Sequence, residues 1–451
     1  MSKPNIPKGT RDFSPEEVAK RNYIFNVLKS HFQQFGFLPI ETPSMEKLST
    51  LTGKYGDEGD QLLFKLLKRG AKFEQALNQA SKSEDISDHQ FSEEALRYDL
   101  TVPFARYVVQ HLNEISFPFK RYQIQPVWRA DRPQRGRYRE FYQCDVDVVG
   151  TTSLNAELEL IQIINHSLSA LKLPNHTINL NNRKILYALI SSCGESSNFN
   201  KITVIIDKLD KVGKEKVLSE LADQINNPSC TTMFESIFDL GNDYNDIISW
   251  LKSRVGATEL GLEGIEEISY IFENCNQLGI KNITLNLTLA RGLNYYTGTI
   301  FEVVLNDYNM GSIIGGGRYD NLTALFGLKD ISGVGISFGA ERIYDVLNES
   351  QLFPEDISVG PEFLIIDQSN AVSNAFKVAE KLRELSKRSM IYPDKQHKLK
   401  KKLKYANQNK IPYVLFISDN FNENMILELK DMITGEQKSI QLKQIIYEIN
   451  G

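Results

Sequence analysis

The sequence contains few cysteines, no long apolar run and no large excess of charge. Its four cysteines among 451 residues lie far apart and match no zinc-binding spacing, so they are interpreted as reduced structural thiols. No apolar segment approaches the roughly 20 residues that cross a bilayer, and the N-terminal MSKPNIPKGTRDF lacks a hydrophobic signal region. These absences argue against a cysteine-ligated metal site and a membrane protein, and they predict a cytoplasmic location.

The small net charge, −5, argues against a protein that coats nucleic acid through a general basic field. Basic residues nevertheless concentrate in residues 129–139 and 395–410, and either segment could contact phosphates. For residues 395–410, composition alone favours a solvent-exposed helix face over a phosphate-binding one.

Length and pattern predict several domains, because 451 residues exceed what one hydrophobic core usually serves. Residues 183–281 contain helical segments with few motifs, which predicts a helical module inserted between residues 1–182 and 282–347 of a catalytic domain. Residues 348–360 are rich in loop-forming residues and predict a linker. In residues 361–451 strand-like and helical stretches alternate, which predicts a small α/β domain.

Two shorter patterns describe the N-terminal region. Ser14 is a candidate helix cap followed by Pro15 and, three residues after the cap, by Glu17, which predicts an amphipathic helix that ends near Gly36. Residues 81–94 are polar and charged, and we expect them to form an exposed connection.

The most informative segment, residues 120–149, has two strand-like runs joined by ADRPQRG. Because side chains alternate between the two faces of a strand, one face of the pair is apolar and the other is polar. The polar face carries arginines, amides and carboxylates: Arg121, Gln123, Gln125, Arg129, Arg137, Arg139, Gln143, Asp145 and Asp147.

An antiparallel sheet can simply turn such a polar face to water. Solvent faces usually favour Lys, Glu and Thr, however, whereas this face is rich in Arg, Gln and Asp. The planar fork of arginine suits phosphate or carboxylate, so Arg129 and Arg137 are candidates for binding a triphosphate. Gln143 and Asp147 could bind a small polar ligand. The polar face of the two strands is therefore interpreted as the floor of a ligand-binding site.

The run VWRADRPQRGRYREFYQCDVDVVG resembles motif 2 of the class II aminoacyl-tRNA synthetases, in the form found in histidyl-tRNA synthetases. The resemblance implies that Arg129 contacts the ATP α-phosphate and the aminoacyl carboxylate, and that Arg137 contacts ATP. It implies that Gln134 approaches the acceptor end of tRNA. By the same resemblance, Gln143 holds the α-amino group of histidine and Asp147 hydrogen-bonds its imidazole.

The segment LARGLNYYTG closely matches a signature peculiar to histidyl-tRNA synthetases. In that family the arginine matching Arg291 reaches the α-phosphate and the carboxylate, where a fixed guanidinium stabilises developing charge. The tyrosines matching Tyr295 and Tyr296 line the histidine pocket. The alternative is that Arg291 pairs with a structural acid and that both tyrosines belong to the core.

The segment LRYDLTVP resembles the part of the family that binds the substrate ammonium group. Asp99, Leu100 and Thr101 are the matching residues, and a carboxylate and a hydroxyl accept hydrogen bonds from an ammonium ion. An Asp and a Thr near the start of a helix are also common caps.

Two glycine-containing segments complete the resemblance. GGGRYD lacks the spacing and the Lys-Ser/Thr of a P-loop, and it matches a family glycine strand where the backbone would closely approach the adenylate. GVGISFGAER resembles class II motif 3, in which Arg342 corresponds to the arginine that meets the ATP γ-phosphate. KGTRD and residues 35–46 resemble the N-terminal segment and motif 1, which builds the dimer interface in the family.

The resemblance implies a mixed α/β (α+β) fold, with a class II antiparallel-sheet catalytic domain, a helical insertion and a small C-terminal α/β anticodon-binding domain. The implied function is ATP-dependent ligation of L-histidine to tRNA(His) by a homodimer, with Mg²⁺ bound through ATP and no metal held by the protein itself. The basic C-terminal segment then supplies candidate tRNA contacts: Lys398, Lys400, Lys401 and Lys402.

Two rival functions agree less well with these motifs. A synthetase-like regulatory subunit of histidine biosynthesis typically loses the catalytic signature and the anticodon domain, and both are present here. A class II synthetase for another amino acid is disfavoured by the tyrosine-containing signature.

Overall fold

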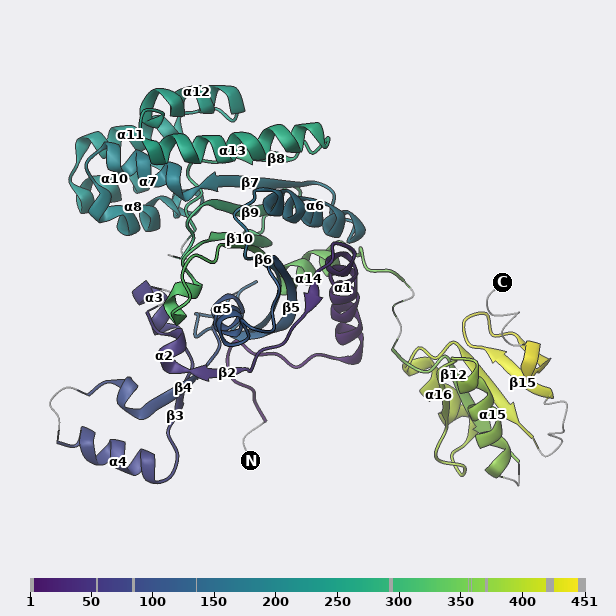
Figure 1. The fold of residues 1–451 in the computed structure, drawn as a ribbon. Coiled ribbons are helices and arrows are strands. Elements are labelled where there is room, and N and C mark those ends of the chain that lie inside the picture. The colour runs from purple at the N-terminus through teal and green to yellow at the C-terminus, as the bar shows by residue number, and fades with distance from the viewer. Residues whose placement is uncertain are drawn as a thin grey trace. The chain divides into compact units, whose positions relative to one another are not determined.

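The chain forms two compact units, Met1–Glu355 and Asp356–Gly451, which are described separately (Figure 1). The computed structural model describes residues 4–53, 56–82, 86–134, 136–291, 295–355, 357, 359–369, 372–418 and 426–444.

An eight-stranded sheet organises the first unit. Its strands run in the order β1-β5-β6-β11-β10-β9-β7-β8, and neighbours are antiparallel except for β1 with β5 and β7 with β8. The order places β11, from late in the chain, directly beside β6. The strands are β1 Leu38–Pro39, β5 Phe119–Trp128, β6 Glu140–Val149, β7 His176–Asn182, β8 Ile283–Leu285, β9 Thr299–Leu305, β10 Ile314–Tyr319 and β11 Gly333–Gly339.

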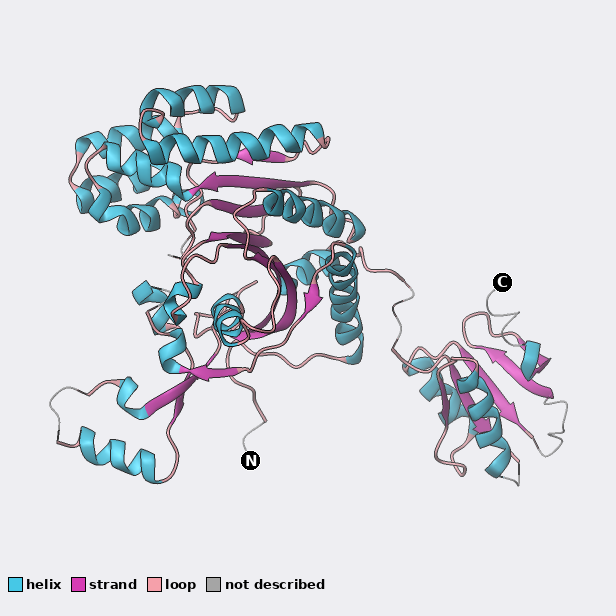
Figure 2. Ribbon diagram, viewed as in Figure 1, coloured by secondary structure: helices cyan, strands magenta, loops and turns pink. Residues whose placement is uncertain are grey.

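Three helices pack together over one face of this sheet (Figure 2): α1 (Pro15–Gln34), α6 (Asn155–Ala170) and α14 (Ala340–Glu349). Ile24, Leu28 and Phe32 of α1 share a buried cluster with Tyr122 and Val146 from the apolar face of β5 and β6. Burial of these side chains, at about 1.5–3 kcal/mol each, holds α1 against the sheet.

The start of α1 follows its sequence signals. The hydroxyl of Ser14 accepts a hydrogen bond from the backbone N–H of Glu17, and the Glu17 carboxylate accepts one from the N–H of Ser14. This capping box satisfies two backbone donors that the helix leaves free. The predicted helix is therefore confirmed, and it ends at Gln34, close to Gly36.

A second, three-stranded sheet has the order β2-β4-β3. Its middle strand, β4 (Ser92–Leu96), pairs with both neighbours, so the expectation of an exposed connection over residues 81–94 is wrong at its C-terminal end. Pairing to two strands outweighs the polar composition of this segment, because β2 and β3 supply backbone hydrogen-bond partners on both sides of it. The other elements of this region are β2 Met45–Lys47, α2 Leu48–Leu51, α3 Gly56–Gln61, β3 Lys65–Leu67, α4 Ala71–Ala80, η1 Asp88–Phe91 and α5 Thr101–Gln110.

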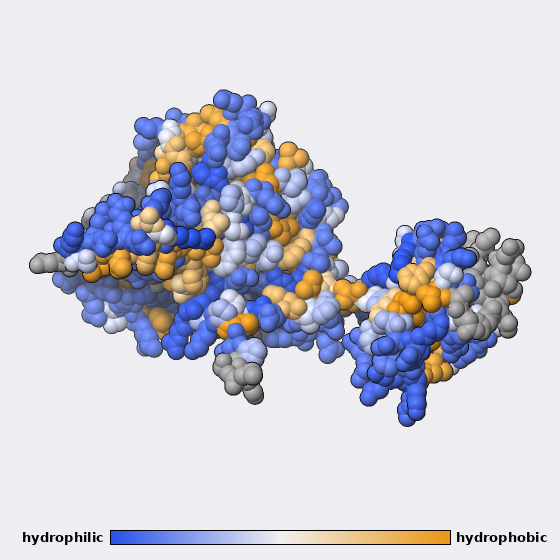
Figure 3. Space-filling model, turned by 90° about the horizontal axis from the view of Figure 1, so that it is seen from below, coloured by the Kyte–Doolittle hydropathy of each residue, from blue (hydrophilic) through white to orange (hydrophobic). Residues whose placement is uncertain are grey.

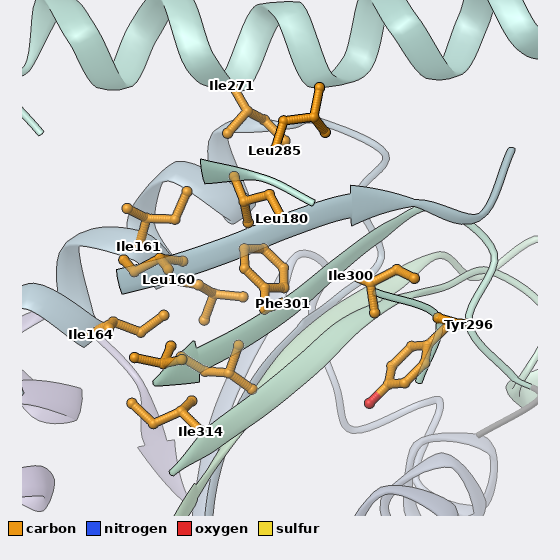
Figure 4. Close-up of a cluster of buried hydrophobic side chains, with 14 of the residues drawn as sticks. Leu160, Ile161, Ile164, Leu180, Ile271, Leu285, Tyr296, Ile300, Phe301 and Ile314 are labelled. Atoms are coloured by element: carbon orange, nitrogen blue, oxygen red, sulfur yellow. The ribbon is translucent and has the colours of Figure 1, made fainter. Parts of the chain in front are cut away.

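Helices fill the chain between β7 and β8 and lie beyond the β7 end of the large sheet (Figure 2). Their apolar side chains continue the core of the sheet: Ile271 of α13 lies close to Leu285 of β8 and Leu180 of β7 (Figure 4). Tyr296 lies at one edge of the same cluster. The helices are α7 Arg183–Ser192, η2 Ser196–Asn198, α8 Phe199–Ile206, α9 Leu209–Val212, α10 Lys214–Ile225, α11 Pro228–Phe238, α12 Tyr244–Val255 and α13 Glu259–Gln277, and η3 (Thr323–Phe326) follows β10.

The second unit is a five-stranded sheet between two helices. Phe363 and Ile365 of β12 pack in one cluster with α15, whereas Leu364 and Ile366 pack in another with α16. Because neighbouring residues of a strand point to opposite faces, the two helices cover opposite faces of the sheet. The elements are β12 Phe363–Asp367, α15 Val372–Glu384, β13 Ser389–Ile391, α16 Leu399–Gln408, β14 Tyr413–Ile417, β15 Ile426–Asp431, β16 Gln437–Gln441 and η4 Leu442–Gln444, in the strand order β13-β12-β14-β15-β16.

The predicted mixed α/β fold, with an antiparallel-rich sheet and a C-terminal sheet domain, is therefore confirmed. Figure 3 shows hydrophilic residues over much of the visible surface, with hydrophobic residues in patches between them. Within the described ranges, none of the helices has both the length and the apolar character needed to cross a membrane.

A buried ion pair ties β10 to α6. Arg318 donates from Nε and from a terminal nitrogen to the two carboxylate oxygens of Glu157, each at 2.6 Å, and the two side chains are 4% and 0% exposed. We predict that Glu157→Ala lowers the free energy of unfolding by about 3–5 kcal/mol, because it leaves the Arg318 charge buried without its partner. Chemical denaturation followed by circular dichroism measures this change.

The matched control is Asp239→Ala, which breaks the exposed pair with Lys214. That change should cost no more than about 1 kcal/mol. Equal effects of the two substitutions would contradict the prediction.

Candidate active site

The polar face of β5 and β6 is buried. Arg121 pairs across the strands with Asp147, and Gln123 pairs with Asp145, as the alternation of side chains predicts. All four residues are at most 3% exposed, which excludes the alternative of a solvent-facing surface for this part of the sheet. Helix α5 lies within the curve of these two strands (Figure 1), and its Phe104 ring sits 4.2 Å from the Arg121 guanidinium.

One guanidinium serves two carboxylates on this floor. A terminal nitrogen of Arg121 lies 2.8 Å from Asp147 Oδ2 and 4.0 Å from Asp145 Oδ2, and the hydroxyl of Tyr319 donates to Asp147 Oδ1 at 2.7 Å. The pKa of Asp145 is raised to about 7, chiefly by burial and in part by the negative charge of Asp147, against the opposing effect of Arg121. Burial also raises the pKa of Asp147, with Arg121 and Tyr319 acting against it.

Small residues of β11 make room for these side chains. Asp147 faces Gly335, Asp145 faces Ser337 and Gln143 faces Gly339 across the two strands. A Cβ atom on Gly335 would lie 1.9 Å from Asp147 Oδ1, so this position admits only glycine while the carboxylate keeps its place.

The predicted ammonium-binding segment lies at the start of α5. Asp99 is buried and accepts a hydrogen bond from the backbone N–H of Val102, as the capping alternative expects. Its other oxygen also accepts one from the Tyr295 hydroxyl at 3.4 Å, which links the segment to the tyrosine-containing signature. Leu100 is buried, and Thr101 is half-buried at the first position of the helix.

The signature tyrosines lie beside the buried carboxylates of β6, because Tyr295 is next to Tyr319, which hydrogen-bonds Asp147. The ring centroids of Tyr295 and Tyr296 are 4.9 Å apart, and Tyr295 lies edge-on to Tyr319 at 6.4 Å. Tyr296 belongs to the hydrophobic core, as the alternative interpretation expects, whereas Tyr295 is half-buried and contacts Asp99. Residues 292–294 of the signature lie outside the described residues.

Arg291 adopts a left-handed backbone conformation, with φ of 58°. Its side chain pairs with Glu302 at 3.5 Å, so the alternative of an acidic partner is met, and each of the two side chains is 24% exposed. The guanidinium lies across Gly315, where a Cβ atom would come within 2.3 Å of it. Tyr296 similarly covers Gly317, so protein side chains occupy the space over the glycine strand that we expected the adenylate to approach.

Four arginines from three segments converge near this point: Arg129 and Arg137 of the β5–β6 hairpin, Arg291 and Arg342. Burial lowers the pKa of Arg342, and the positive charges of Arg137, Arg291 and Arg129 lower it further. Arg342 donates to the carbonyls of Gly136 and Ser312, which fixes it at the start of α14.

The other members of the cluster are held differently. Arg129 stacks 4.3 Å from the ring of Tyr98, and Arg137 is half exposed, 3.8 Å from Asp131. Clustered guanidinium groups repel one another unless an anion lies between them, so the arrangement favours a polyphosphate.

The predicted tRNA contacts divide into exposed and buried residues. Gln134 is exposed in a tight turn closed by reciprocal backbone hydrogen bonds with Arg137. Lys398, Lys400 and Lys401 are exposed on or beside α16.

Lys402 is buried, unlike the three exposed lysines, although it was also a candidate tRNA contact. Its side chain is 5% exposed, and its ammonium donates to the carbonyl of Lys395 and lies 5.6 Å from the Tyr392 ring. The helical period turns this position toward the sheet, so Lys402 is withdrawn as an RNA contact.

Sequence reasoning assigned no role to Tyr319, Ser337 or Gly335. The alternation of small residues in GVGISFG was the available signal, since small side chains facing a polar strand mark a close approach. Among the described residues no group of three His, Cys, Asp or Glu side chains is arranged to hold a metal ion.

A family model described as Histidyl-tRNA synthetase matches residues 9–343, and one described as Anticodon binding domain matches residues 359–451. The chain belongs to the histidyl-tRNA synthetase family. These matches leave no support for the alternative of a class II synthetase for another amino acid.

Relatives and solved structures extend this likeness over the whole chain. A Histidine–tRNA ligase of Phocaeicola vulgatus is 50% identical, covering 99% of this chain and 98% of that protein, and one of Cytophaga hutchinsonii is 47% identical over all of both. The crystal structure of histidyl-tRNA synthetase from Nostoc sp. PCC 7120 has a TM-score of 0.80 at 28% identity, covering 99% of this chain and 98% of that one.

A further structural neighbour is titled as an ATP phosphoribosyltransferase regulatory subunit/histidyl-tRNA synthetase from Bacillus halodurans. It has a TM-score of 0.72 at 20% identity, covering 92% of this chain and 98% of that one. At this identity the likeness concerns the fold alone, and it lends the regulatory alternative no support.

The raised pKa of Asp145 makes stability depend on pH. Because its folded-state pKa is about 7 against an ordinary value of 3.8, the folded protein keeps a proton that the unfolded chain releases between about pH 4 and 7. This stabilisation is complete below about pH 4 and is lost as pH rises through about 7. We predict that the wild type loses stability relative to Asp145→Asn over this range, as urea denaturation at several pH values measures.

Asp239→Asn, at an exposed position, provides the control and should follow the wild-type pH curve. Parallel curves for the wild type and Asp145→Asn would rule out the raised pKa.

Proposed function

We propose that this chain is a histidine–tRNA ligase, which activates L-histidine with ATP to histidyl-adenylate and transfers histidine to tRNA(His), releasing AMP and diphosphate. The observation that carries the proposal is the similarity, at about half of all positions and over the full length, to proteins named Histidine–tRNA ligase. The buried carboxylate floor beside an arginine cluster supports it, because the reaction needs both.

The floor is proposed to bind histidine. Asp147 Oδ2 is buried, 2.8 Å from the Arg121 guanidinium, and a carboxylate oxygen has two lone pairs, so it can also accept the N–H of an imidazole ring. Tyr295 and Tyr296 would line the ring. Asp99, together with Gln143 and Thr101, would receive the α-ammonium group, whose positive charge a carboxylate favours; Leu100 contributes apolar surface beside them.

The arginine cluster is proposed to bind ATP. Arg129 and Arg291 would flank the α-phosphate and the attacking carboxylate, and Arg137 and Arg342 would hold the outer phosphates. The histidine carboxylate itself attacks the α-phosphorus, so no protein nucleophile is needed and catalysis is positioning and charge stabilisation. Mg²⁺ would arrive bound to the phosphates of ATP and neutralise part of their charge.

The remaining parts are proposed to serve tRNA and assembly. Residues 1–182 and 282–347 would form the catalytic domain and residues 183–281 an inserted module. Residues 348–360 would link these parts to an anticodon-binding domain of residues 361–451. Gln134 would approach the acceptor end of tRNA, and exposed lysines of α16 would contact phosphates. The reaction would take place in the cytoplasm.

We predict that Arg291→Ala lowers the rate of histidine-dependent ATP–pyrophosphate exchange by roughly 10²- to 10³-fold, because one fixed charge at the phosphate is removed. The exposed Arg254→Ala, on α12, is the control and should leave the rate near that of the wild type. Near-normal exchange by Arg291→Ala would remove this residue from the catalytic assignment. A panel of amino acids in the same assay tests the whole proposal, and exchange without preference for histidine would contradict it.

We predict that replacing Lys398, Lys400 and Lys401 together with Gln weakens tRNA binding and leaves pyrophosphate exchange unchanged. The slope of log affinity against log salt should become shallower by up to roughly 0.7–0.9 per lost phosphate contact, as filter binding at several salt concentrations measures. Lys377→Gln with Lys381→Gln, on the opposite face of the domain, is the control. An unchanged slope in the triple variant would mean that these lysines form a solvent-exposed helix face and do not contact tRNA.

The homodimer is proposed to form through the motif 1 region. Leu38 on the edge strand β1 and Met45 on β2 are 57% and 53% exposed, which leaves apolar surface for a second copy to cover. We predict that Leu38→Asp with Met45→Asp produces monomers in light scattering, because two charges would be buried in the interface. Ile433→Asp, at an apolar position 84% exposed in the second unit, should remain dimeric. A wild-type monomer, or a dimeric double variant, would contradict the proposed interface.

A further inference from the structure

Three polar side chains form a chain of hydrogen bonds between β6 and β11. Ser337 lies directly opposite Asp145 in the strand register and hydrogen-bonds its carboxylate. The Ser337 oxygen also accepts a hydrogen bond from the side-chain amide of Gln143, with Nε2 and Oγ 3.0 Å apart. Gln143 is the residue proposed above to receive the α-ammonium group, and the inference below rests on that proposed function.

The hydroxyl of Ser337 has a single proton, and this limits how the chain can be arranged. Above about pH 7 Asp145 is ionised, and an ionised carboxylate only accepts hydrogen bonds, so the proton of Ser337 then points to Asp145. The lone pairs of Ser337 then require a donor, and the amide NH₂ of Gln143 is the only end of that amide that can donate. If the amide were reversed, two oxygens without a proton between them would face each other.

The amide oxygen of Gln143 is consequently directed away from Ser337. This oxygen is buried and has no hydrogen-bond partner within the described residues. A buried acceptor without a partner costs about 1–3 kcal/mol, which a ligand that donates a hydrogen bond can recover. An ammonium group donates three such bonds, whereas a carboxylate or an ether oxygen donates none.

Arg121 keeps Asp145 suited to this role. Its guanidinium has no exposed surface and lies 4.0 Å from Asp145 Oδ2, so it favours the charged form of the carboxyl group. Arg121 therefore favours the charged form of Asp145, Asp145 orients the Ser337 hydroxyl, and Ser337 orients the Gln143 amide.

We propose that Asp145 and Ser337 are positioning residues that hold the amide oxygen of Gln143 toward the bound amino acid, so that the site selects ligands with an α-ammonium group. Neither residue touches the substrate. The selection arises because the two residues decide which end of the amide faces the ligand.

The test compares ligands with and without the ammonium group in Ser337→Ala and Ser337→Thr. At about pH 8.5, where Asp145 is ionised, Ser337→Ala should raise the KM for histidine roughly 5- to 30-fold in pyrophosphate exchange. Its kcat and its KM for ATP should stay within about twofold of the wild type, because the phosphate-binding arginines are untouched. Inhibition by histidinol, which retains the ammonium group, should weaken by the same factor, and inhibition by imidazolepropionate, which lacks it, should not change. Ser337→Thr keeps the hydroxyl and should resemble the wild type.

Asp145→Asn provides a second, independent variant. Its amide can donate to Ser337, which frees the Ser337 proton to bind the Gln143 oxygen and turns the NH₂ group toward the ligand. The KM for histidine should rise at least as much as in Ser337→Ala, and adding Ser337→Ala to it should cause little further change.

Each outcome separates the possibilities. Equal weakening of histidinol and imidazolepropionate by Ser337→Ala would mean that Ser337 only supports the shape of the site, and the inference would be overturned. An unchanged KM for histidine in Ser337→Ala would overturn it as well. A wild-type protein without histidine-dependent exchange would instead overturn the proposed function on which the inference rests.

Discussion

Two carboxylates, Asp145 and Asp147, lie buried in the middle of a β-sheet, and much of the site depends on how their charge is tolerated. Removing a carboxylate from water costs several kcal/mol unless a cation and hydrogen bonds replace the lost solvation. Arg121 supplies the cation, and Tyr319 and Ser337 supply hydrogen bonds. Phe104 of helix α5 packs against the Arg121 guanidinium, and the small residues of β11 leave the space that the carboxylates occupy. Arg121, Tyr319 and Ser337 thus contact the carboxylates and Gln143 from within the fold, which limits the positions that these side chains can adopt.

The same strands serve stability and binding on their two faces. The apolar side chains of β5 and β6 join the core beneath α1, α6 and α14, whereas the polar side chains point toward α5 and the tyrosines. The arginines at the rim oppose stability, since Arg129, Arg137, Arg291 and Arg342 bring four positive charges together. An anionic ligand would relieve this repulsion, so the free energy that the fold gives up there is available for binding.

Local patterns predicted a large part of this structure. The cap at Ser14 specified the start of α1, the period of two between residues 120 and 149 specified which side chains share a face, and the alternation in residues 361–451 specified an α/β unit. Local patterns failed where pairing with a distant segment decided the outcome. Ser92–Leu96 is polar but is a central strand, and Lys402 lies in a basic run but faces inward. Neither position can be judged without knowing what packs against it.

By itself, the sequence determined the family, the mixed α/β fold and the residue types of the site, because these depend on motifs and periodicities within short stretches of chain. Only the tertiary structure decided how the polar residues work together. Arg121 meets two carboxylates, Tyr319 reaches Asp147 and Ser337 orients Gln143 because β11 lies beside β6 and β10 beside β11, and the strand order that places them there is set by packing of the whole sheet. Hydrogen bonds and ion pairs act over a few ångströms, so residues far apart along the chain acquire partners only when the fold brings them together.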